Sequence, residues 1–235
     1  MGIRRGPNII TDGLKLAVDP ANPSSYPGSG TVCNDLTITQ NNGTLINGTS
    51  FETSNGGVFN LDGTNDRITF NNLNIGINDI SIQMWIKTTK VDFNYPMAQG
   101  GGANSSSERG VGIGLTNVGY VYGFINSANT RIFVNTNPIK SVNDGNWHNI
   151  AGVWDRSDKL TWYVDGVFDQ EGDISSTDGQ SITLEKDLYI GTYGSAVNNQ
   201  GTFYGNIGPA YVYMRTLSAT EILQNYNALK GRFGL

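Results

Sequence analysis

Cysteine, histidine and charge are scarce in this sequence. Its 235 residues include one cysteine and one histidine, and Asp, Glu, Lys and Arg together make up 15%. The lone Cys33 excludes an internal disulfide, and a metal site using it with His148 would need carboxylates as its other ligands. A nucleophile–base pair would have to use His148, which stands beside Trp147 in a strand pattern. We therefore expect His148 to be a structural residue.

Basic clusters and long apolar runs are also missing. The 15 lysines and arginines are spread along the chain, and the formal net charge is −5. Nucleic acid is bound by a clustered basic face, so we expect no nucleic-acid partner. A membrane span needs about 20 consecutive apolar residues, so we expect no membrane partner. Residues 1–12 likewise lack the apolar segment of a signal peptide.

Glycine and asparagine are abundant, and short runs of alternating apolar and polar residues lie between them. The 31 glycines and 28 asparagines tolerate positive φ, which is typical of a fold with many tight turns. Alternation indicates half-buried strands. In residues 80–87, for example, Ile80, Ile82, Met84 and Ile86 share one face and Trp85 lies on the other. Further strands are expected over residues 120–125, 131–135, 147–154, 160–164, 182–184, 188–190 and 207–214.

Turn and cap signals complete the predicted architecture. Asp144-Gly145 and Asp165-Gly166 predict type I′ hairpins. Ser218 and Glu221 have the spacing of a capping box, which predicts a helix over residues 218–230. We therefore predict an all-β fold, a two-sheet antiparallel jelly-roll sandwich over residues 14–235 with a short C-terminal helix. Residues 1–13 form an N-terminal arm.

Four segments, in this order, resemble those of the laminin-G/concanavalin-A-like lectin-glucanase superfamily. They are the strand–turn–strand of residues 59–68, the tryptophan-containing strand of residues 80–86, the Trp-His and Tyr-Val-Asp-Gly hairpin of residues 144–167, and the closing strand and helix of residues 205–222. The resemblance implies a sandwich of the concanavalin-A/laminin-G type. A fold does not by itself assign a function.

The first 50 residues are similar to the start of small laminin-G-domain proteins of tailed phages, notably cyanophages. The similar segments are residues 6–14, 16–30, 42–45 and 47–49. This resemblance implies a non-enzymatic virion surface protein, such as a capsid decoration, fibre or tail-associated module. Its partners would be other virion proteins and copies of itself. It would be made in the host cytoplasm without a signal peptide and located on the virion surface.

The N-terminal arm is the segment expected to take part in assembly. It contains Arg4, Arg5 and Pro7, followed by the apolar pair Ile9 and Ile10. Pro7 favours extended backbone on either side. An extended basic arm on an acidic sandwich suits docking on another subunit by strand addition or by charge. The alternative is a frayed terminus.

Candidate ligand-binding residues are of two kinds. Sugars are held by aromatic rings together with amide and carboxylate hydrogen bonds. The candidates for binding a surface glycan flank the predicted loops, and each has simple packing as its alternative: Tyr95, Tyr120, Tyr122, Tyr193 and Tyr204. No cofactor is required, and calcium is the one serious metal candidate.

The calcium candidates share one turn. Asp62, Asn65 and Asp66 offer hard oxygen ligands there. The resemblance implies that relatives bind calcium near this turn with help from an acid in the closing strand, a position where this chain has Gly208. The alternative is that Asp62 and Asp66 cap the turn through backbone N–H groups.

Paired carboxylates would be needed for glycoside hydrolysis, at a separation of about 5–5.5 Å in retaining enzymes. The E-x-D-x-x-E motif of sandwich glucanases is absent, and the nearest pattern is Asp169, Glu171 and Asp173, expected to be a solvated strand end. We therefore expect no catalytic residues and no enzyme activity. Three hypotheses result: a virion surface module that binds a host glycan, a lectin-like module without an assembly role, and, as the weakest, a glycoside hydrolase.

Overall fold

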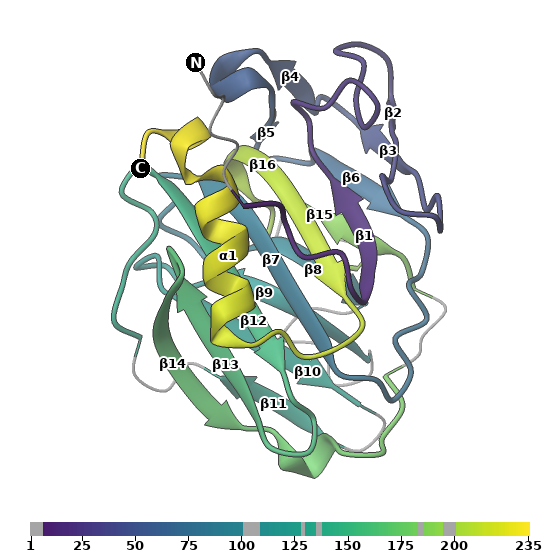
Figure 1. The fold of residues 1–235 in the computed structure, drawn as a ribbon, viewed down its shortest axis with the longest axis vertical. Helices are drawn as coiled ribbons and strands as arrows, with labels where there is room; N and C mark the ends of the chain where they lie inside the picture. The colour runs from purple at the N-terminus through teal and green to yellow at the C-terminus, as the bar shows by residue number, and fades with distance from the viewer. Residues whose placement is uncertain (1–6, 101–108, 128–129, 135–137, 183–185, 195–200) are drawn as a thin grey trace.

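The computed structural model describes residues 7–100, 109–127, 130–134, 138–182, 186–194 and 201–235. Two antiparallel sheets of eight strands each lie face to face over these residues (Figure 1). This confirms the predicted all-β sandwich with a short C-terminal helix. Short helical turns lie at Ser54–Gly56, Ser175–Thr177 and Lys230–Phe233.

The first sheet, here called sheet I, contains the longest strands. In spatial order it consists of β14 (Val167–Asp173), β13 (Lys159–Val164), β12 (Trp147–Trp154), β7 (Ile80–Lys87), β16 (Tyr204–Tyr213), β5 (Val58–Asp62) and β4 (Ser50–Glu52), with β1 (Leu14–Val18) also paired to β16.

The second sheet, sheet II, lies behind sheet I in Figure 1. Its order is β11 (Arg131–Val134), β10 (Val121–Asn126), β9 (Gly110–Leu115), β8 (Asn94–Gly100), β15 (Leu188–Ile190), β6 (Arg67–Phe70), β3 (Gly43–Ile46) and β2 (Val32–Cys33).

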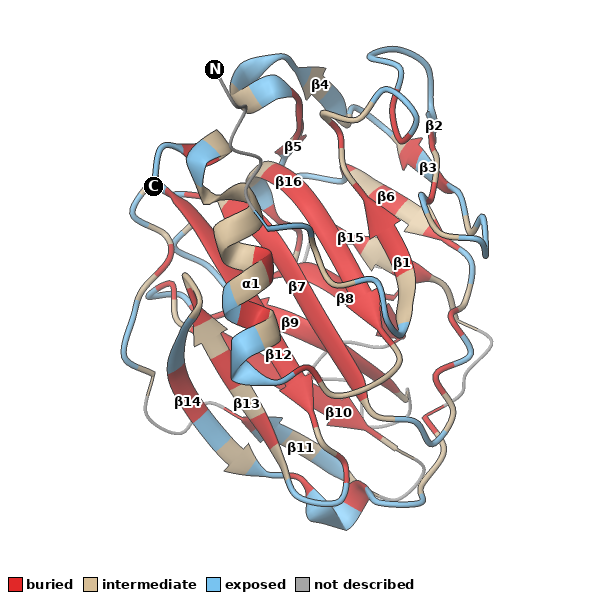
Figure 2. Cartoon of the chain, in the orientation of Figure 1, coloured by how far each residue is buried: buried red, intermediate tan, exposed pale blue. Residues whose placement is uncertain are grey.

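The main core lies between the two sheets, where the alternating patterns place their apolar residues. The predicted face of β7 points inward, because Ile80, Ile82, Met84 and Ile86 all belong to this core. Figure 2 shows the central strands of sheet I almost entirely buried. β7, β12 and β15 have the predicted bounds. Ile182 lies outside any strand, and the rest of the strand predicted over 182–184 falls outside the described residues.

Strand β16 changes its neighbour halfway along its length. Residues 204–207 pair with β5, and residues 210–213 pair with β1. Gly208 and Pro209 fall between the two halves, where the pairing with β7 is also irregular. A proline cannot donate a ladder hydrogen bond and is tolerated in a sheet at such a bulge. The sequence Gly208-Pro209 therefore marks the point at which β16 passes from one neighbour to the other.

The outer face of sheet I is covered by the C-terminal helix α1 (Ala219–Leu229). Its N-terminus has the predicted capping box, formed by Ser218 and Glu221. The ring of Trp85, on the face of β7 opposite to the core, stacks on Tyr226 at 5.6 Å and on Phe233 at 4.2 Å between ring centroids. The helix and the helical turn Lys230–Phe233 that follows it therefore give the second face of β7 its own apolar cover.

Of the two predicted hairpins, one is confirmed. Asp165 and Gly166 have φ of 54° and 77°, as a type I′ turn requires, and they join β13 directly to β14. Only Gly145 of the other pair has positive φ. Asp144 instead accepts hydrogen bonds from Asn146 and precedes β12 in a loop, so that hairpin prediction is wrong.

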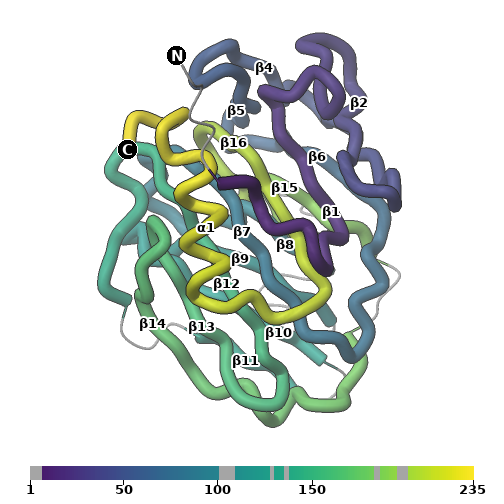
Figure 3. Tube along the Cα trace, in the orientation of Figure 1, coloured from purple at the N-terminus to yellow at the C-terminus, as the bar shows by residue number. Residues whose placement is uncertain are grey.

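The described part of the N-terminal arm lies against its own domain. Ile9 and Ile10 pack on the apolar cluster beneath α1. The carbonyl of Asn8 accepts a hydrogen bond from Gln224 of the helix. Figure 3 shows this purple segment passing beside α1 before it enters β1. Pro7 is exposed, and Arg4 and Arg5 lie outside the described residues. The arm's role in assembly stays a prediction.

Candidate functional site

A row of mostly polar side chains crosses five strands on the outer face of sheet I, beyond the area that α1 covers. Asn60 of β5 is the register partner of Asn206 of β16, and Asn206 is the partner of Lys87 of β7. Ser50 opposes Asn60, and Trp147 opposes Lys87. Register partners project side by side from the same face of a sheet. The row therefore brings together residues that are far apart in the sequence.

Tyr204 adds an aromatic ring to this row. It stands two residues before Asn206 on β16, so both side chains leave the same face of the strand. Tyr204 is 48% exposed. Beside it lies a groove of about 180 Å³, lined by Asn60, Lys87, Thr88, Thr89, Gly145, Tyr204, Gly205 and Asn206. We call this the Tyr204 groove.

The backbone under the Tyr204 groove is fixed by Thr88. Its hydroxyl donates to the carbonyl oxygen of Tyr204 at 2.6 Å and accepts from the backbone N–H of Lys90 at 3.0 Å. The Lys90 ammonium reaches across to the Thr202 carbonyl oxygen at 2.7 Å. The carbonyl groups of Thr202 and Tyr204 are thus both hydrogen-bonded to the loop that follows β7. The exposed ring projects from a fixed backbone.

Two charged side chains of opposite sign, Glu52 and Lys87, lie on either side of Asn206. Glu52 of β4 accepts a hydrogen bond of 3.4 Å from Nδ2 of Asn206. Lys87 lies on the other side of Asn206. The structure shows no hydrogen bond or ion pair on the Lys87 ammonium within the described part of the chain. Lys87 is therefore the charged side chain in the lining of the groove, while Glu52 lies outside the lining and reaches it through Asn206.

His148 of β12 lies next to Trp147, and its ring is held at both nitrogens. Nδ1 is 2.9 Å from a carboxylate oxygen of Asp165, and Nε2 is 3.1 Å from one of Asp144. Burial lowers the pKa of His148, but the hydrogen bonds and charges of Asp165 and Asp144 outweigh it and raise the pKa above its usual value. A buried imidazole clamped in this way agrees with the structural role predicted for it.

Three of the five predicted glycan-binding tyrosines come together elsewhere. Tyr95, Tyr122 and the partly buried Tyr193 form one cluster with Ala98 and Phe124, on a separate face from the Tyr204 groove. The Tyr95 ring contacts those of Tyr193 at 4.7 Å and Tyr122 at 6.0 Å. Tyr95 and Tyr122 are 4% and 5% exposed. They therefore pack within the fold, which was the alternative for each of them.

Tyr120 and Tyr204 stand apart from this cluster. Tyr120 is half-buried just before β10, in an isolated bridge with Ser141; its N–H donates to the Thr116 hydroxyl and its carbonyl oxygen accepts from the Thr116 N–H. Tyr204 alone of the five lines the groove. Sequence reasoning did not name its partners Asn60, Lys87 and Asn206 as candidates for binding. Their signal lies in the pairing between strands, which sequence periodicity does not contain.

The proposed calcium ligands form a capped turn. Asp66 is 3% exposed, and its two carboxylate oxygens accept from the backbone N–H groups of Gly48 at 2.7 Å and Asp62 at 3.0 Å. Asp62 accepts from the N–H of Thr64. Asn65 contributes its carbonyl oxygen to Asn47. Searching the described residues finds no group of three His, Cys, Asp or Glu side chains placed to hold a metal ion. The geometry is that of the alternative, with the carboxylates of Asp62 and Asp66 bound to backbone N–H groups of this turn and of Gly48.

The three acids of β14 do not act together. Asp169 is 2% exposed and accepts from the N–H groups of Ile139 and Lys140, while Glu171 pairs with Lys159 and Asp173 caps the following turn. The prediction of a solvated strand end is therefore wrong for Asp169, whose carboxylate holds the loop before β12. The irregular pairing of β13 with β14 turns Asp169 and Gln170 both inward.

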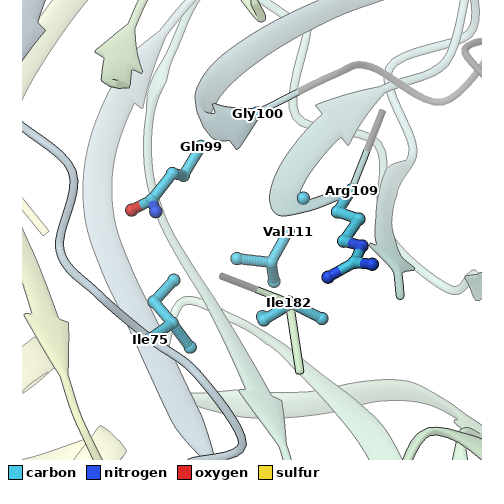
Figure 4. Close-up of a pocket in the computed structure, with 7 residues that line it drawn as sticks. Ile75, Gln99, Gly100, Arg109, Val111 and Ile182 are labelled. Carbon is cyan, nitrogen blue, oxygen red and sulfur yellow. The ribbon is translucent and has the colours of Figure 1, made fainter. Parts of the chain in front are cut away.

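A second hollow lies at the end of β8 and β9 in sheet II. Figure 4 shows Gln99 and Ile75 on one side of it and Arg109, Val111 and Ile182 on the other. It leaves no room for a water molecule. Gln99 is already engaged by the backbone N–H of Leu73 and by Asn72. This hollow is packing space and not a ligand site.

Comparisons with known proteins identify the family. Residues 62–223 match the family described as the concanavalin A-like lectin/glucanases superfamily. The chain belongs to this superfamily. Among curated proteins no match is found.

Within the described residues no helix is long and apolar enough to cross a bilayer.

Solved structures show the same fold at low sequence identity. The binding domain of Paraclostridial Mosquitocidal Protein 1 aligns with a TM-score of 0.71 and 15% identity, over 92% of this chain and 52% of that one. Domain 4 of AbnA, an extracellular arabinanase of Geobacillus stearothermophilus solved with arabinotriose, aligns at 0.68 and 15%, over 91% and 98%. The botulinum neurotoxin serotype D ligand-binding domain, solved with N-acetylneuraminic acid, aligns at 0.66 and 15%, over 92% and 50%.

These similarities establish a lectin-like sandwich. The chain spans about half the length of the two toxin domains and nearly all of the arabinanase domain. Glycosidase chains also occur among the similar structures, as with the sialidase of Trypanosoma rangeli, of which this chain covers 33%.

Proposed function

We propose that this protein is a carbohydrate-binding module that holds one sugar ring in the Tyr204 groove. The observation that carries the proposal is the row Asn60–Asn206–Lys87 beside the exposed Tyr204 ring. The fold agrees with it, since two similar structures were solved with saccharides.

The chemistry of the Tyr204 groove suits a sugar. The electron-rich face of an aromatic ring attracts the C–H groups on one side of a pyranose, while amide and hydroxyl groups bond its hydroxyls. Asn60 and Asn206 each supply a donor and an acceptor, and Thr89 supplies a hydroxyl. The volume of about 180 Å³ is smaller than the roughly 300–1,000 Å³ of pockets for drug-sized ligands. The groove therefore accommodates one ring, with the rest of a glycan in solvent.

A glycan array followed by a titration tests the proposal. The purified protein is applied to neutral and acidic glycans, and the best ligand is titrated while the amide NMR signals are followed. We expect the signals of Lys87, Thr88 and Tyr204 to shift. Tyr204→Ala is expected to weaken binding about tenfold, because loss of a stacked ring removes about 1.4 kcal/mol, close to the upper value for an aromatic pair.

A matched tyrosine variant provides the control. Tyr120→Ala removes another partly exposed tyrosine that does not line the groove. It is expected to leave affinity unchanged. If Tyr120→Ala and Tyr204→Ala lower affinity equally, or if the shifted signals cluster around Tyr95 and Tyr193, the groove is not the site.

We also propose that the module works on a virion surface, in contact with other virion proteins. Support comes from the similarity of the first 50 residues to small laminin-G-domain proteins of tailed phages. In the described part of the arm, Asn8 and Ile10 are hydrogen-bonded to the protein's own helix α1. Residues 1–6, with Arg4 and Arg5, are therefore the part of the arm to test for assembly.

Purified particles test this second proposal. An antibody against the protein should detect it in density-gradient fractions of intact particles. Arg4→Ala/Arg5→Ala should lower its incorporation while the melting temperature stays the same. Absence of the protein from washed particles, with the protein abundant in the lysate, would contradict a virion location and leave carbohydrate binding untouched.

A further inference from the structure

The positive charge of Lys87 in the lining of the Tyr204 groove indicates which kind of sugar binds there. Resting on the proposed function, we propose that the groove selects a sugar that carries an anionic group, bound at Lys87. The sugar hydroxyls then point toward Asn60 and Asn206.

Lys87 is the lysine that lines the Tyr204 groove, and its ammonium has no hydrogen bond or ion pair within the described residues, as is also the case for Lys15 on β1, outside the groove. Lys140 pairs with Asp165, Lys159 with Glu171, and Lys90 donates to the Thr202 carbonyl. Lys87 is half-buried at the end of β7, between Asn206 and Trp147 in the register of the sheet. A partly desolvated charge without a partner gains more from an opposite charge than a fully solvated one does.

The nearby acids leave Lys87 available to a ligand. Glu52 is directed to Asn206 and to the hydroxyl of Ser54. Asp62, the register partner of Tyr204, accepts from the N–H of Thr64 within its own turn. Asp144, in the loop before β12, is held by Asn146 and His148. Each of these acids has other partners, so a ligand anion competes with no existing ion pair at Lys87.

Glu52 fixes the direction in which such a ligand lies. A carboxylate accepts hydrogen bonds from sugar hydroxyls but repels an anionic group. Glu52 contacts Asn206 on the side away from Lys87. An anionic sugar therefore has one favourable orientation in the groove, with its charged group at Lys87 and its neutral edge toward Asn206, on the side where Glu52 lies beyond the lining. A neutral sugar lacks this preference.

Matched sugar pairs provide the test. The methyl glycosides of glucose, galactose and mannose are each compared with the corresponding uronic acid and the 6-sulfate by NMR titration at 50 mM NaCl. In the ring configuration that binds, we expect the anionic member to bind at least tenfold more tightly. Comparing the uronic acid with the 6-sulfate shows which anionic group is preferred. Tighter binding of either one than of the neutral sugar supports the proposal. Raising NaCl to 500 mM should reduce the preference, since the shorter screening length weakens the attraction.

Two lysine variants separate local from general charge effects. Lys87→Met keeps the length of the side chain and should make the neutral and anionic sugars bind equally. Lys15→Met changes the net charge by the same amount on β1, outside the groove, and should preserve the preference. Melting temperatures confirm that both variants fold.

The outcomes distinguish this inference from the proposed function. If neutral and anionic sugars bind equally to the unaltered protein, and Tyr204→Ala weakens both, the module binds sugar but the role of Lys87 is wrong. If no member of any pair binds and no glycan is retained on the array, the proposed function itself is wrong. If Lys15→Met removes the preference as fully as Lys87→Met does, the selectivity comes from overall charge and the inference fails.

Discussion

The backbone N–H of Ile10 donates a hydrogen bond of 2.7 Å to Oδ1 of Asn225. Asn225 is 1% exposed, and its Nδ2 donates to Gln83 of β7 at 2.8 Å and to the hydroxyl of Tyr213 of β16 at 3.1 Å. That hydroxyl donates in turn to the Ile10 carbonyl at 3.0 Å. One buried amide thus joins the N-terminal segment, the helix and two strands of sheet I.

We expect Asn225→Ala to lower the free energy of unfolding by about 3 kcal/mol, because it leaves the N–H of Ile10 and Oε1 of Gln83 without partners and removes one of the two hydrogen bonds of the Tyr213 hydroxyl. Urea denaturation followed by tryptophan fluorescence measures the loss. Gln224→Ala, which removes an exposed hydrogen bond to Asn8, should cost less than about 1 kcal/mol. Equal losses from the two variants would show that the buried network contributes nothing specific.

The stability of the protein should depend on pH through its one histidine. Because Asp165 and Asp144 raise the pKa of His148 in the folded state, protonation favours folding. This contribution is complete below the unfolded pKa of about 6.5 and is lost as pH rises through the higher folded pKa. Between pH 6 and 9 the difference in unfolding free energy between the unaltered protein and His148→Gln should therefore shrink. NMR titration of the single imidazole measures the pKa of His148 in the folded protein. A pKa at or below about 6.5 would contradict the stabilisation of its charged form by Asp165 and Asp144.

Local patterns predicted the elements whose residues are close in sequence. The alternation of residues 80–87 was sufficient for β7, and the spacing of Ser218 and Glu221 was sufficient for the start of α1, because both patterns depend on neighbours along one element. Asp144-Gly145 shows the limit of such reasoning. The same dipeptide forms a hairpin only where strands pair on both sides, and that pairing is a tertiary property.

The candidate site was predictable only in part. Tyr204 was identified as an aromatic residue near a turn, but nothing in its neighbourhood distinguishes it from Tyr95 or Tyr122. The distinction comes from burial, since Tyr95 and Tyr122 pack against Phe124 while Tyr204 remains exposed. Asn60, Lys87 and Asn206 meet through the register of β5, β7 and β16, and strand register across long loops cannot be read from one sequence.

The capping box of α1 predicts a measurable helix contribution. The Ser218 hydroxyl accepts from the N–H of Glu221 at 3.3 Å, and Glu221 accepts from the N–H of Ser218 at 2.8 Å. We expect Ser218→Ala to lower the free energy of unfolding by about 1 kcal/mol. Ser218→Asp keeps an acceptor at this position and should restore most of it. If Ser218→Asp is as unstable as Ser218→Ala, the hydroxyl contributes by something other than capping.

The last prediction concerns the strand contact beneath the Tyr204 groove. Gly205 has φ of 125°, and a Cβ at this position would overlap with the carbonyl oxygen of Lys87, which is backbone and cannot move aside as a flexible side chain does. Gly205→Ala should therefore cost about 3 kcal/mol or more, as strain and steric overlap add. It should also separate β16 from β7 at the groove, shifting the amide NMR signals of Lys87 and Thr88 and abolishing sugar binding under conditions where the protein is still folded.

Gly30→Ala is the matched control for this change. Gly30 also has positive φ, 89°, but a Cβ there has no atom within 4 Å. Gly30→Ala should therefore lower the free energy of unfolding by about 1 kcal/mol, the cost of placing alanine at positive φ without any steric overlap. It should leave sugar binding intact. The excess loss in Gly205→Ala over Gly30→Ala then measures how closely the two strands must approach to form the groove. If the two variants are equally stable, or if Gly205→Ala binds sugar normally, the close approach of β16 to β7 does not support the site.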